Sequence, residues 1–429
     1  MLFLYNILFY ILFFLFLPFH LKKILVKGKY KRGVRERFGF FTKQKLAEID
    51  RSKKAILIHA VSVGEVLTAL SVVKQLSRTY GESHNIILTT TTMTGYSIAE
   101  KNKPESVHLF FFPLDFYGAT RRVMSALSPS LIVIIETEIW PNFISYAHAQ
   151  KIPLVIINGR ISEKSYSRYL KTRFFFKQII NKVDAYGMQT KEDKKRIMDM
   201  GLLPEKISVT GNIKIDNTQQ LSVSKNVVEK LKADLKIKDR EYILVAGSTH
   251  PGEEAILAGV YKELKKEFSS LLLVIIPRHI ERSKKIKKML REQQLKTVFF
   301  SEGPYAEDMD VLLVDSMGVL VKFYSMANVV FVGKSLLPPG GGQNMLEPAA
   351  LSKPIICGPY LSNFSQMSKL LIKANGLLVA SDAKGLKQEI SKIFKDNDLS
   401  DKLGSNARKF IEGHKGAVAG NLKLIGQYL

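Results

Sequence analysis

The sequence predicts an α/β protein built from two parallel-sheet domains, with an apolar helix in front of them. Three features indicate this class. Short runs rich in Val, Ile and Leu recur along the chain, longer helical patterns separate them, and a polar stretch near the middle interrupts the series. Near-continuous apolar strands joined by helical crossovers are typical of doubly wound parallel sheets. The 429 residues are enough for two such domains, each with its own core.

The first element that we expect is an apolar N-terminal helix. Residues Met1–Phe19 are apolar except for Asn6, and 19 helical residues extend over roughly 28 Å, close to the ~30 Å hydrocarbon core of a bilayer. A cleaved signal peptide fits poorly, because no basic segment precedes this run and no A-x-A site follows it. We expect residues 1–21 to be a membrane anchor, which either spans the bilayer or forms a re-entrant or interfacial helix.

A basic segment, residues 22–54, follows this helix. It contains 13 Lys and Arg but only three acids, Glu36, Glu48 and Asp50. A basic segment next to an apolar helix predicts that the rest of the chain lies on the cytoplasmic side, close to anionic lipid. The formal charge of the whole chain is +25, which indicates anionic partners such as phospholipid head groups, phosphorylated substrates or nucleic acid. A single cysteine, Cys357, excludes a disulfide framework and favours a reducing compartment.

Two series of strands follow, one for each domain. Residues 55–215 form the first domain, with strands at Ala55–Val61, Asn85–Thr92, Val107–Pro113, Ser130–Glu136, Pro153–Asn158 and Ala185–Gln189. The polar stretch 216–225 (DNTQQLSVSK) is the predicted linker. Residues 226–405 form the second domain, with strands at Tyr242–Ser248, Leu271–Pro277, Lys296–Phe300, Val311–Asp315, Val329–Val332 and Pro354–Cys357. Rossmann-like halves that face one another would place a ligand cleft at the carboxyl ends of both sheets.

The most informative motif lies between the last two of these strands. Three consecutive glycines, Gly340–Gly342, precede Asn344, which we expect to open a helix with Glu347 one turn in. Glycines at such a corner let the backbone approach a ligand, and a helix start favours a phosphate. Glu347 would then accept hydrogen bonds from ribose hydroxyls. The alternative is an ordinary loop in which Glu347 completes a capping box with Asn344.

Acidic residues follow two strands of the first domain. Glu65 lies on the first turn of the helix after the first strand, where its alternative role is only to complement the helix dipole. Glu136 and Glu138 follow the fourth strand, close to Trp140. Because an acid at a strand end is expensive to bury without a partner, these positions are candidates for catalysis.

The second domain offers candidate anion-binding residues. Ser248 and Thr249 precede a helix, and Arg278 is able to bind phosphate in a bidentate manner. His279, next to it, fits a surface residue equally well. Histidines and carboxylates do not occur at metal-ligand spacing, and the one Asp-x-Asp element, Asp308–Asp310, precedes its strand instead of ending one.

A set of ordered motifs resembles the Kdo (3-deoxy-D-manno-octulosonate) transferases of lipopolysaccharide assembly, over essentially the whole chain. The motifs are RERFGF (35–40), HAVSVGE (59–65), ETEIWPN (136–142), GNIKID (211–216), AGSTHPGEE (246–254), IPRH (276–279), DSMG (315–318) and GGGQNMLEPA (340–349). The resemblance implies a GT-B architecture, in which two Rossmann-like domains face a central cleft. It also implies that the C-terminal helix, residues 406–429, crosses back to the first domain. The implied reaction is inverting transfer of Kdo from CMP-Kdo to a lipid A precursor at the cytoplasmic face of the inner membrane, without a required metal.

The resemblance also assigns roles to residues. Glu65 matches the general base, and Glu136 and Lys214 match residues that stabilise the transition state. The matching CMP-binding residues are Pro277, Arg278, Met317, Gly318, Val319, Asn344, Met345, Leu346 and Glu347. Further candidates are Ser248, Thr249, Gly341, Gly342, Gln343 and Glu138. Lys214 and Met317–Val319 come from the resemblance alone.

Two residues depart from the family pattern. Gln343 replaces a more usual histidine and Val319 a common glutamate, so side-chain roles at these two positions are expected to differ. Backbone contacts at both positions are compatible with the residues present.

The expected partners are CMP-Kdo, a lipid A precursor and the membrane, and no nucleic acid is expected. One alternative is another GT-B lipid glycosyltransferase that uses a UDP-sugar. An alternative of a different class is a non-catalytic, membrane-tethered protein that binds nucleic acid or anionic lipid. It would bind in a salt-sensitive way without turnover, and it leaves the acids at the strand ends unexplained.

Overall fold

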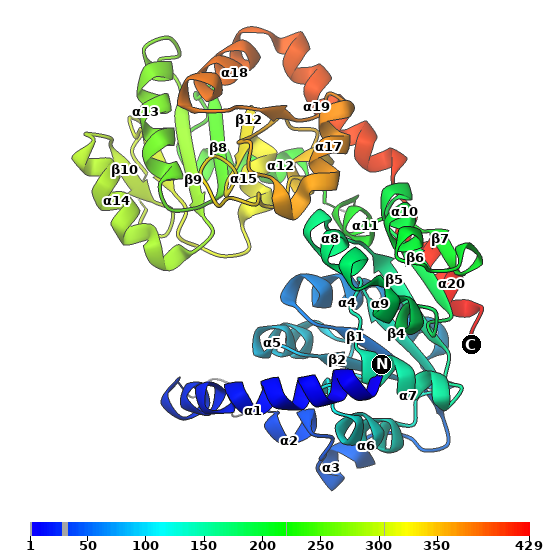
Figure 1. Ribbon diagram of the computed structural model, residues 1–429. Helices are drawn as coiled ribbons and strands as arrows, with labels where there is room; N and C mark the ends of the chain where they lie inside the picture. Colours follow the sequence, from blue (N-terminus) through cyan, green and yellow to red (C-terminus); the bar gives the residue numbers. More distant parts are fainter. Residues whose placement is uncertain (1, 28–32, 220, 304) are drawn as a thin grey trace. The chain divides into compact units, whose positions relative to one another are not determined.

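The computed structural model describes residues 2–27, 33–219, 221–303 and 305–429 (Figure 1). The chain divides into two compact units. The first unit is Met1–Asn217 together with Gly416–Leu429, and the second unit is Thr218–Lys415. Each unit contains one parallel sheet with helices on both faces, so the predicted pair of Rossmann-like domains is confirmed.

The described residues of the first unit form a seven-stranded parallel sheet with the order β3-β2-β1-β4-β5-β6-β7. The strands are β1 (Lys54–Ala60), β2 (His84–Thr90), β3 (Val107–Phe111), β4 (Leu131–Ile135), β5 (Leu154–Gly159), β6 (Ala185–Met188) and β7 (Ile207–Val209). The order reverses between β1 and β4, which pair directly. Ligands of such sheets bind at the carboxyl ends of the strands at this reversal, and the chain places Glu65 and Glu136 just after these two strands.

The helices of the first unit cover both faces of its sheet. Strand β1 alternates between the faces, because Ile56 and Ile58 pack with Val66 in one cluster while Leu57 packs with Phe143 in the other. The helices are α4 (Val63–Tyr80), α5 (Met93–Asn102), α6 (Tyr117–Leu127), α7 (Pro141–Ala149), α8 (Glu163–Lys171), α9 (Arg173–Ile180), α10 (Lys191–Asp199) and α11 (Ile213–Gln219). Burial on both faces explains why these strands are almost uniformly apolar.

A C-terminal helix, α20 (Ala417–Gly426), also belongs to the first unit. The Asp216 carboxylate accepts hydrogen bonds from the backbone N–H of Gly416 (2.9 Å) and Val418 (2.7 Å) at its start. The preceding helix, α19 (Asn397–Gly413), belongs to the second unit. The expected boundary between residues 405 and 406 therefore falls inside α19, because Leu403 of that helix packs in the core of the second unit.

The second unit, with residues 220 and 304 left aside, forms a seven-stranded parallel sheet with the order β10-β11-β9-β8-β12-β13-β14. The strands are β8 (Ile243–Thr249), β9 (Leu272–Pro277), β10 (Thr297–Phe299), β11 (Val311–Leu313), β12 (Val329–Val332), β13 (Ile355–Cys357) and β14 (Leu378–Val379). The remaining helices are α12 (Lys225–Asp234), α13 (Glu253–Lys265), α14 (Ser283–Glu292), α15 (Leu320–Met326), α16 (Leu346–Ala350), α17 (Ser365–Lys373) and α18 (Ala383–Lys395). The order reverses between β8 and β12, which precede the candidate loops of this unit.

Several local expectations differ from the structure. Helix α11 continues to Gln219, inside the predicted linker 216–225. Helix α16 begins at Leu346 and not at Asn344, because the Asn344 Oδ1 atom accepts a hydrogen bond from the Leu346 N–H (3.2 Å). The short edge strands β7 and β14 were not predicted, since runs of three and two residues carry no readable periodicity.

The N-terminal helix, α1 (Leu2–Lys27), is followed by two short helices, α2 (Val34–Arg37) and α3 (Lys43–Ala47). In the part of the chain that the structure describes, no helix has both the length and the apolarity needed to cross a membrane. The expected anchor of residues 1–21 stays a prediction.

Candidate functional site

Glu65 lies at the carboxyl end of β1, where α4 begins. Its Oε1 atom accepts a hydrogen bond from the Ser62 hydroxyl (2.8 Å), and its Oε2 atom accepts one from the Val61 N–H (2.8 Å). The Ser62 hydroxyl in turn accepts from the Glu65 N–H (3.4 Å), so Ser62 is the N-cap of α4. Burial, and then the charge of Glu136, raise the pKa of the Glu65 carboxyl. A buried carboxyl with a raised pKa suits a general base, and Glu65 remains a candidate for that role in addition to its contacts at the start of α4.

Glu136 follows the last residue of β4 and adopts a left-handed backbone conformation, with φ of 61°. Lys214 Nζ lies 2.8 Å from its Oε1 atom, and Arg160 Nε lies 3.1 Å from its Oε2 atom. Positive φ at a non-glycine residue costs on the order of 1–3 kcal/mol, so the contacts of Glu136 must offset this strain. The two cations offset the cost of burying the carboxylate.

Lys214 reaches Glu136 because the loop before α11 is held in place. The Asn158 Oδ1 atom accepts a hydrogen bond from the Ile213 N–H (3.0 Å), and the Asn212 Oδ1 atom accepts one from the Lys214 N–H (2.9 Å). Sequence reasoning alone missed Lys214, because β7 was not predicted and the residues after it were not placed at a strand end. The turn GN before a helical pattern was the signal that could have identified it.

Glu138 adds a third carboxyl group to this edge of the sheet. Burial raises its pKa to about 7, and the nearby charges of Glu65 and Glu136 act in the same direction. Burial raises the pKa of Tyr169, and the nearby charge of Glu138 raises it further. The first unit therefore brings together Glu65, Glu136, Glu138 and Lys214, all of which were sequence candidates.

In the second unit, a buried glutamate that sequence reasoning missed organises the loops after β8 and β12. Glu253 is 1% exposed. Its Oε2 atom accepts hydrogen bonds from the N–H of His250 (2.8 Å) and Lys334 (2.7 Å), and its Oε1 atom accepts from those of Ser335 (2.9 Å) and Leu336 (3.0 Å). Because β8 and β12 pair with each other, one carboxylate fixes both loops. The repeated acid in GEE was the available signal.

The neighbouring Glu254 forms a bidentate pair with Arg282, with N–O distances of 3.0 and 3.1 Å. The Thr249 hydroxyl donates to the Glu254 Oε1 atom (2.9 Å) and is fully buried. The side chain of Thr249 is thus used inside the unit. Ser248 is the next-to-last residue of β8, has φ of 55° and is half-buried.

The glycine-rich segment is more internally bonded than the sequence suggested. Gly340–Gly342 all have positive φ, and a Cβ atom on Gly340 would lie 2.1 Å from Cβ of Tyr360. The N–H of Gly341 donates to the Tyr360 carbonyl (2.9 Å), and that of Gly342 donates to the Lys334 carbonyl (2.7 Å). These two N–H groups are therefore occupied by protein carbonyls, and the role of Gly341 and Gly342 in ligand binding stays a prediction.

Glu347 and Arg278 lie close enough to interact. The Asn344 Nδ2 group donates to the Glu347 Oε1 atom (2.9 Å), which is a side-chain pair and not the capping box of the alternative interpretation. Burial raises the pKa of Glu347, while Asn344 and the positive charge of Arg278 oppose that rise. Arg278 itself is exposed after the buried Pro277, with its N–H bonded to the Thr249 carbonyl (3.1 Å).

The remaining candidate nucleotide-binding residues differ in how exposed their side chains are. Met345 and Leu346 are buried in the core and offer only backbone atoms. Met317 is 80% exposed in the turn before α15, where Gly318 has φ of 80°. Since β11, β9, β8 and β12 are neighbours in the sheet, all these segments follow strands at one sheet edge.

Gln343 contacts a histidine that the sequence reasoning did not select. Its Nε2 atom lies 3.0 Å from Nε2 of His250, and the ring of His279 is 5.8 Å from that of His250. Burial lowers the pKa of His250, and the charges of Lys334, His279 and Arg282 also lower it, against an opposing effect of Glu253. A neutral His250 is therefore placed at the candidate donor site.

Residues of the Asp-x-Asp element have protein partners. Asp308 pairs with Lys296, and Asp310 accepts from the Tyr261 hydroxyl (2.8 Å) and the Lys296 N–H (2.9 Å). Within the described residues, no group of three His, Cys, Asp or Glu side chains is arranged to hold a metal ion.

Comparison with known proteins identifies the family. Residues 32–217 match the family model of 3-deoxy-D-manno-octulosonic-acid transferases, and residues 227–410 match that of group 1 glycosyl transferases. The 3-deoxy-D-manno-octulosonic acid transferase of Haemophilus influenzae is 32% identical over 94% of this chain and 92% of its own length. That of Chlamydophila psittaci is 33% identical over 86% of this chain and 83% of its own. This chain belongs to the Kdo transferase family.

Membership in the Kdo transferase family makes this protein a glycosyltransferase, as the motifs predicted. Solved structures support the fold at much lower identity. A glycosyltransferase from Rickettsia africae has a TM-score of 0.59 at 13% identity, over 88% of this chain and 98% of that one. A UDP-GlcNAc 2-epimerase from Neisseria meningitidis has a TM-score of 0.57 at 13% identity, over 86% of this chain and all of that one.

Proposed function

We propose that this Kdo transferase family member transfers Kdo from CMP-Kdo to a lipid A precursor, with inversion, at the cytoplasmic face of the inner membrane. The observation that carries the proposal is the cluster of Glu65, Glu136 and Lys214 at the strand-order reversal of the first sheet. A buried carboxyl group beside a lysine–carboxylate pair supports base-assisted attack by a sugar hydroxyl.

Glu65 is the proposed general base. The acceptor hydroxyl oxygen attacks the anomeric carbon of Kdo, and its proton passes to the Glu65 carboxylate. The bond from that carbon to the phosphate oxygen of CMP breaks, and its electron pair leaves with CMP. A single displacement of this kind inverts the anomeric configuration. The raised pKa of Glu65 makes its carboxylate a stronger base than an exposed glutamate.

Lys214 is assigned to the negative charge that develops in the transition state. Glu136 holds its ammonium group at 2.8 Å, and Arg160 neutralises the second oxygen of the same carboxylate. A cation fixed in advance stabilises a developing charge without further reorganisation. Glu136 is thus a positioning residue whose burial and backbone conformation serve the lysine.

The second unit is assigned to CMP. Arg278 provides a planar guanidinium group for the phosphate, and the Oε2 atom of Glu347, opposite the one that Asn344 occupies, is an acceptor for ribose hydroxyls. The turn Met317–Val319 contributes backbone groups. The N–H groups of Gly341 and Gly342 bond to protein carbonyls, so Arg278 is the main phosphate ligand in this proposal.

No metal is required in this proposal, because Lys214 and Arg278 supply positive charge. The basic segment 22–54 and the apolar helix α1 support a membrane location on the side of the cytoplasm.

The test is mass spectrometry of a lipid A precursor incubated with the protein and CMP-Kdo in detergent. We expect a product heavier by Kdo, formed equally well in excess EDTA, and no product with UDP-sugars. Transfer from a UDP-sugar but not from CMP-Kdo would replace the donor assignment. Loss of turnover in EDTA with rescue by Mg²⁺ would overturn the metal-free mechanism. Anion binding without any turnover would favour the non-catalytic alternative.

A further inference from the structure

Helix α1 is attached to the first unit by polar contacts near its start. The Tyr5 hydroxyl donates to Oδ2 of Asp115 (2.9 Å), and Nδ2 of Asn142 donates to Oδ1 of Asn6 (2.6 Å). Asp115 is 1% exposed and also accepts from the N–H groups of Asn142 (3.0 Å) and Phe143 (2.9 Å) at the start of α7. Buried polar groups need partners, so these bonds set where the helix docks.

Aromatic packing extends the attachment along the helix. The ring of Phe116, which caps α6, lies 5.1 Å from Phe9, 4.9 Å from Tyr10 and 4.8 Å from Phe13, measured between centroids. Contacts from residue 5 to residue 13 cover about 12 Å of helix at ~1.5 Å per residue. Helix α1 therefore lies lengthwise on the first unit and does not point away from it.

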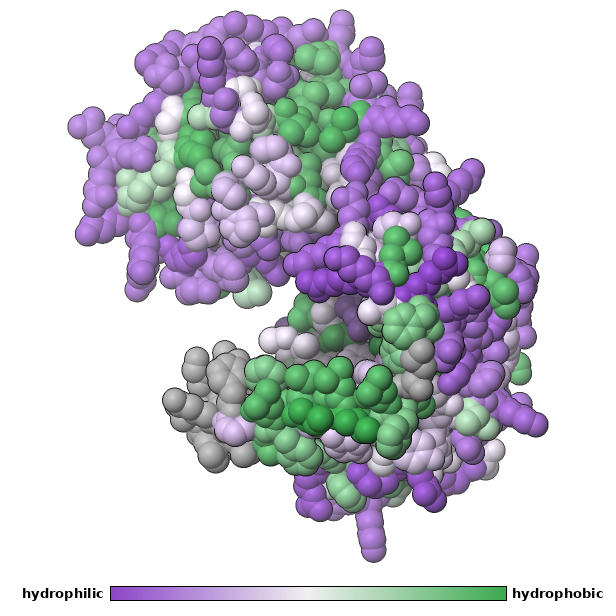
Figure 2. Space-filling view, in the orientation of Figure 1, coloured by the Kyte–Doolittle hydropathy of each residue, from purple (hydrophilic) through white to green (hydrophobic). Residues whose placement is uncertain are grey.

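The opposite side of α1 is apolar and uncovered. Figure 2 shows the helix as a continuous hydrophobic band. Its exposed large apolar side chains, from 41% to 77% exposed, are Phe3, Leu4, Ile7, Leu8, Ile11, Leu12, Phe14, Leu15 and Phe16. Two neighbouring aromatic residues, Phe40 and Tyr117, are also about half exposed, at 52% and 53%. An apolar surface of this extent marks an interaction site.

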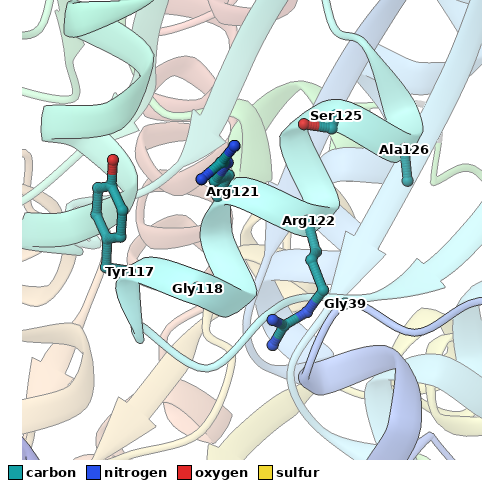
Figure 3. A pocket seen from close by; sticks show the side chains of 7 residues that line it. All are labelled: Gly39, Tyr117, Gly118, Arg121, Arg122, Ser125 and Ala126. Atoms are coloured by element: carbon teal, nitrogen blue, oxygen red, sulfur yellow. The ribbon is translucent and has the colours of Figure 1, made fainter.

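A cationic pocket of about 560 Å³ lies on the neighbouring helix α6 (Figure 3). Arg121 and Arg122 are both exposed in it. Arg122 donates through Nε to the Phe38 carbonyl (2.7 Å), and its guanidinium lies 4.5 Å from the Phe40 ring. Arg121 forms no ion pair with any acid of the described residues.

The pocket and the helix share one surface. Phe38, whose carbonyl Arg122 binds, also packs against Phe13 of α1 (6.4 Å) and Phe116 (6.1 Å). Arg51, from the segment before β1, also reaches the pocket lining, since its Nη1 atom donates to the carbonyl of Ala126, a lining residue (2.8 Å). Arginines therefore border an apolar, aromatic-rich helix face.

We propose that α1 is an in-plane helix, which lies along the surface of an anionic bilayer with its outer face among the acyl chains and with lipid phosphate in the Arg121–Arg122 pocket. Interfacial helices bury an apolar face ~5–10 Å deep and gain from adjacent basic residues. Basic residues near an anionic surface are attracted to its lipid head groups. A second copy of this chain is a poorer occupant, because it would bring like charges together in a protein of charge +25. The inference rests on the proposed membrane location but not on Kdo transfer.

Depth measurements test the orientation. The sole cysteine, Cys357, is buried, so single cysteines at Leu4, Leu8, Ile11 and Leu15 can be labelled selectively with a fluorophore. The full-length protein is bound to vesicles of 70% phosphatidylcholine and 30% phosphatidylglycerol, and spin-labelled lipids report each depth. We expect similar depths at all four positions. A helix that spans the bilayer would place Leu4 and Leu15 about 16 Å apart in depth, and that gradient would overturn the proposal.

Charge reversal tests the pocket. Arg121→Glu should weaken binding to the anionic vesicles about tenfold and leave binding to pure phosphatidylcholine vesicles unchanged. The matched control is Lys288→Glu on α14, whose side chain is 81% exposed in the second unit, and it should change binding much less. Arg121→Gln removes the charge without reversing it and should weaken binding by an intermediate factor. This variant shows that the loss follows the charge and not misfolding. Equal effects of Arg121→Glu and Lys288→Glu would remove the pocket from the proposal.

Two outcomes separate this inference from the proposed function. Turnover on detergent-dispersed acceptor without binding to either vesicle type would overturn the in-plane helix and leave Kdo transfer standing. Dimerisation in solution that Leu8→Gln abolishes, with unchanged vesicle binding, would assign the apolar face to a second copy instead.

Discussion

Lys214 Nζ lies 2.8 Å from Oε1 of Glu136, although 78 positions separate the two residues. The lysine stands on the first turn of α11, and the glutamate follows β4 in a left-handed conformation. The pair joins two loops at one edge of the first sheet. In this geometry Glu136 holds a cation, and Glu65, whose pKa is raised, is the proposed base.

We expect Glu65→Gln to reduce turnover about 10²–10⁴-fold, the usual contribution of a general base. CMP affinity should stay near that of the wild type, because the proposed nucleotide contacts belong to the second unit. Ser62→Ala is the matched control, since it removes the N-cap hydroxyl that bonds to Glu65 but keeps the carboxylate. Turnover, CMP binding and thermal midpoint are measured for both variants. Near wild-type turnover in a folded Glu65→Gln protein would limit Glu65 to its capping role.

We expect Lys214→Met to reduce turnover by about 10²-fold, because a preorganised donor to the developing charge is lost. Stability should change by no more than about 1 kcal/mol, since the lysine is part-exposed and Arg160 still pairs with Glu136. Lys214→Arg should recover part of the rate. A stability loss that alone explains the lower activity, seen by chemical denaturation, would make the pair structural.

Glu138 should make folding stability depend on pH. Its folded-state pKa is raised from 4.5 to about 7, so the folded protein binds more protons than the unfolded chain between these values. The stabilising contribution is complete below pH 4.5 and is lost as pH rises toward 7. The difference in free energy of unfolding between Glu138→Gln and the wild type should therefore be larger at pH 8 than at pH 4. We expect it to favour the variant at pH 8 by on the order of 1–3 kcal/mol more. Denaturation at both pH values tests this, and a pH-independent difference would contradict it.

Glu253→Gln should destabilise the second unit by about 2–4 kcal/mol and weaken CMP binding, because the amide NH₂ would face backbone N–H donors that now share a carboxylate. Glu263→Gln on the same helix is the control, since its side chain is exposed. Isothermal titration with CMP and thermal unfolding would measure both effects. If a destabilised but folded Glu253→Gln protein bound CMP with unaltered affinity, the loops that Glu253 holds would not determine nucleotide binding.

Gln343→His should retain most activity. The glutamine amide and a neutral imidazole both donate one hydrogen bond, and His250 at 3.0 Å is the neighbour that either side chain would meet. Steady-state kinetics with CMP-Kdo would measure the change. A loss beyond about tenfold, equal to ~1.4 kcal/mol, would mean that His250 and Gln343 form a pairing specific to this chain.

Much of the fold was readable because its signal is local. The apolar runs predicted strands that occur in the same order in the structure, and Val329–Val332 was predicted with its observed ends. Two strands end earlier than predicted. Glu136, with φ of 61°, lies after the end of β4 at Ile135, and Thr92, whose side chain accepts from the Gly95 N–H, caps α5 instead of extending β2. Apolar periodicity carries no signal for a left-handed residue or for a cap.

The two parallel sheets, the family and the strand-end acids Glu65 and Glu136 were predictable from the sequence, because periodicity and motif order are properties of neighbouring residues. Three contacts became visible in the folded chain alone: Lys214 pairs with Glu136, Glu253 holds a loop 82 positions away at Ser335, and Tyr5 docks α1 on Asp115, 110 positions away. A buried polar group needs a partner, and the crossovers of the fold determine which group lies within reach. Residue spacing along the chain does not encode which partner that is.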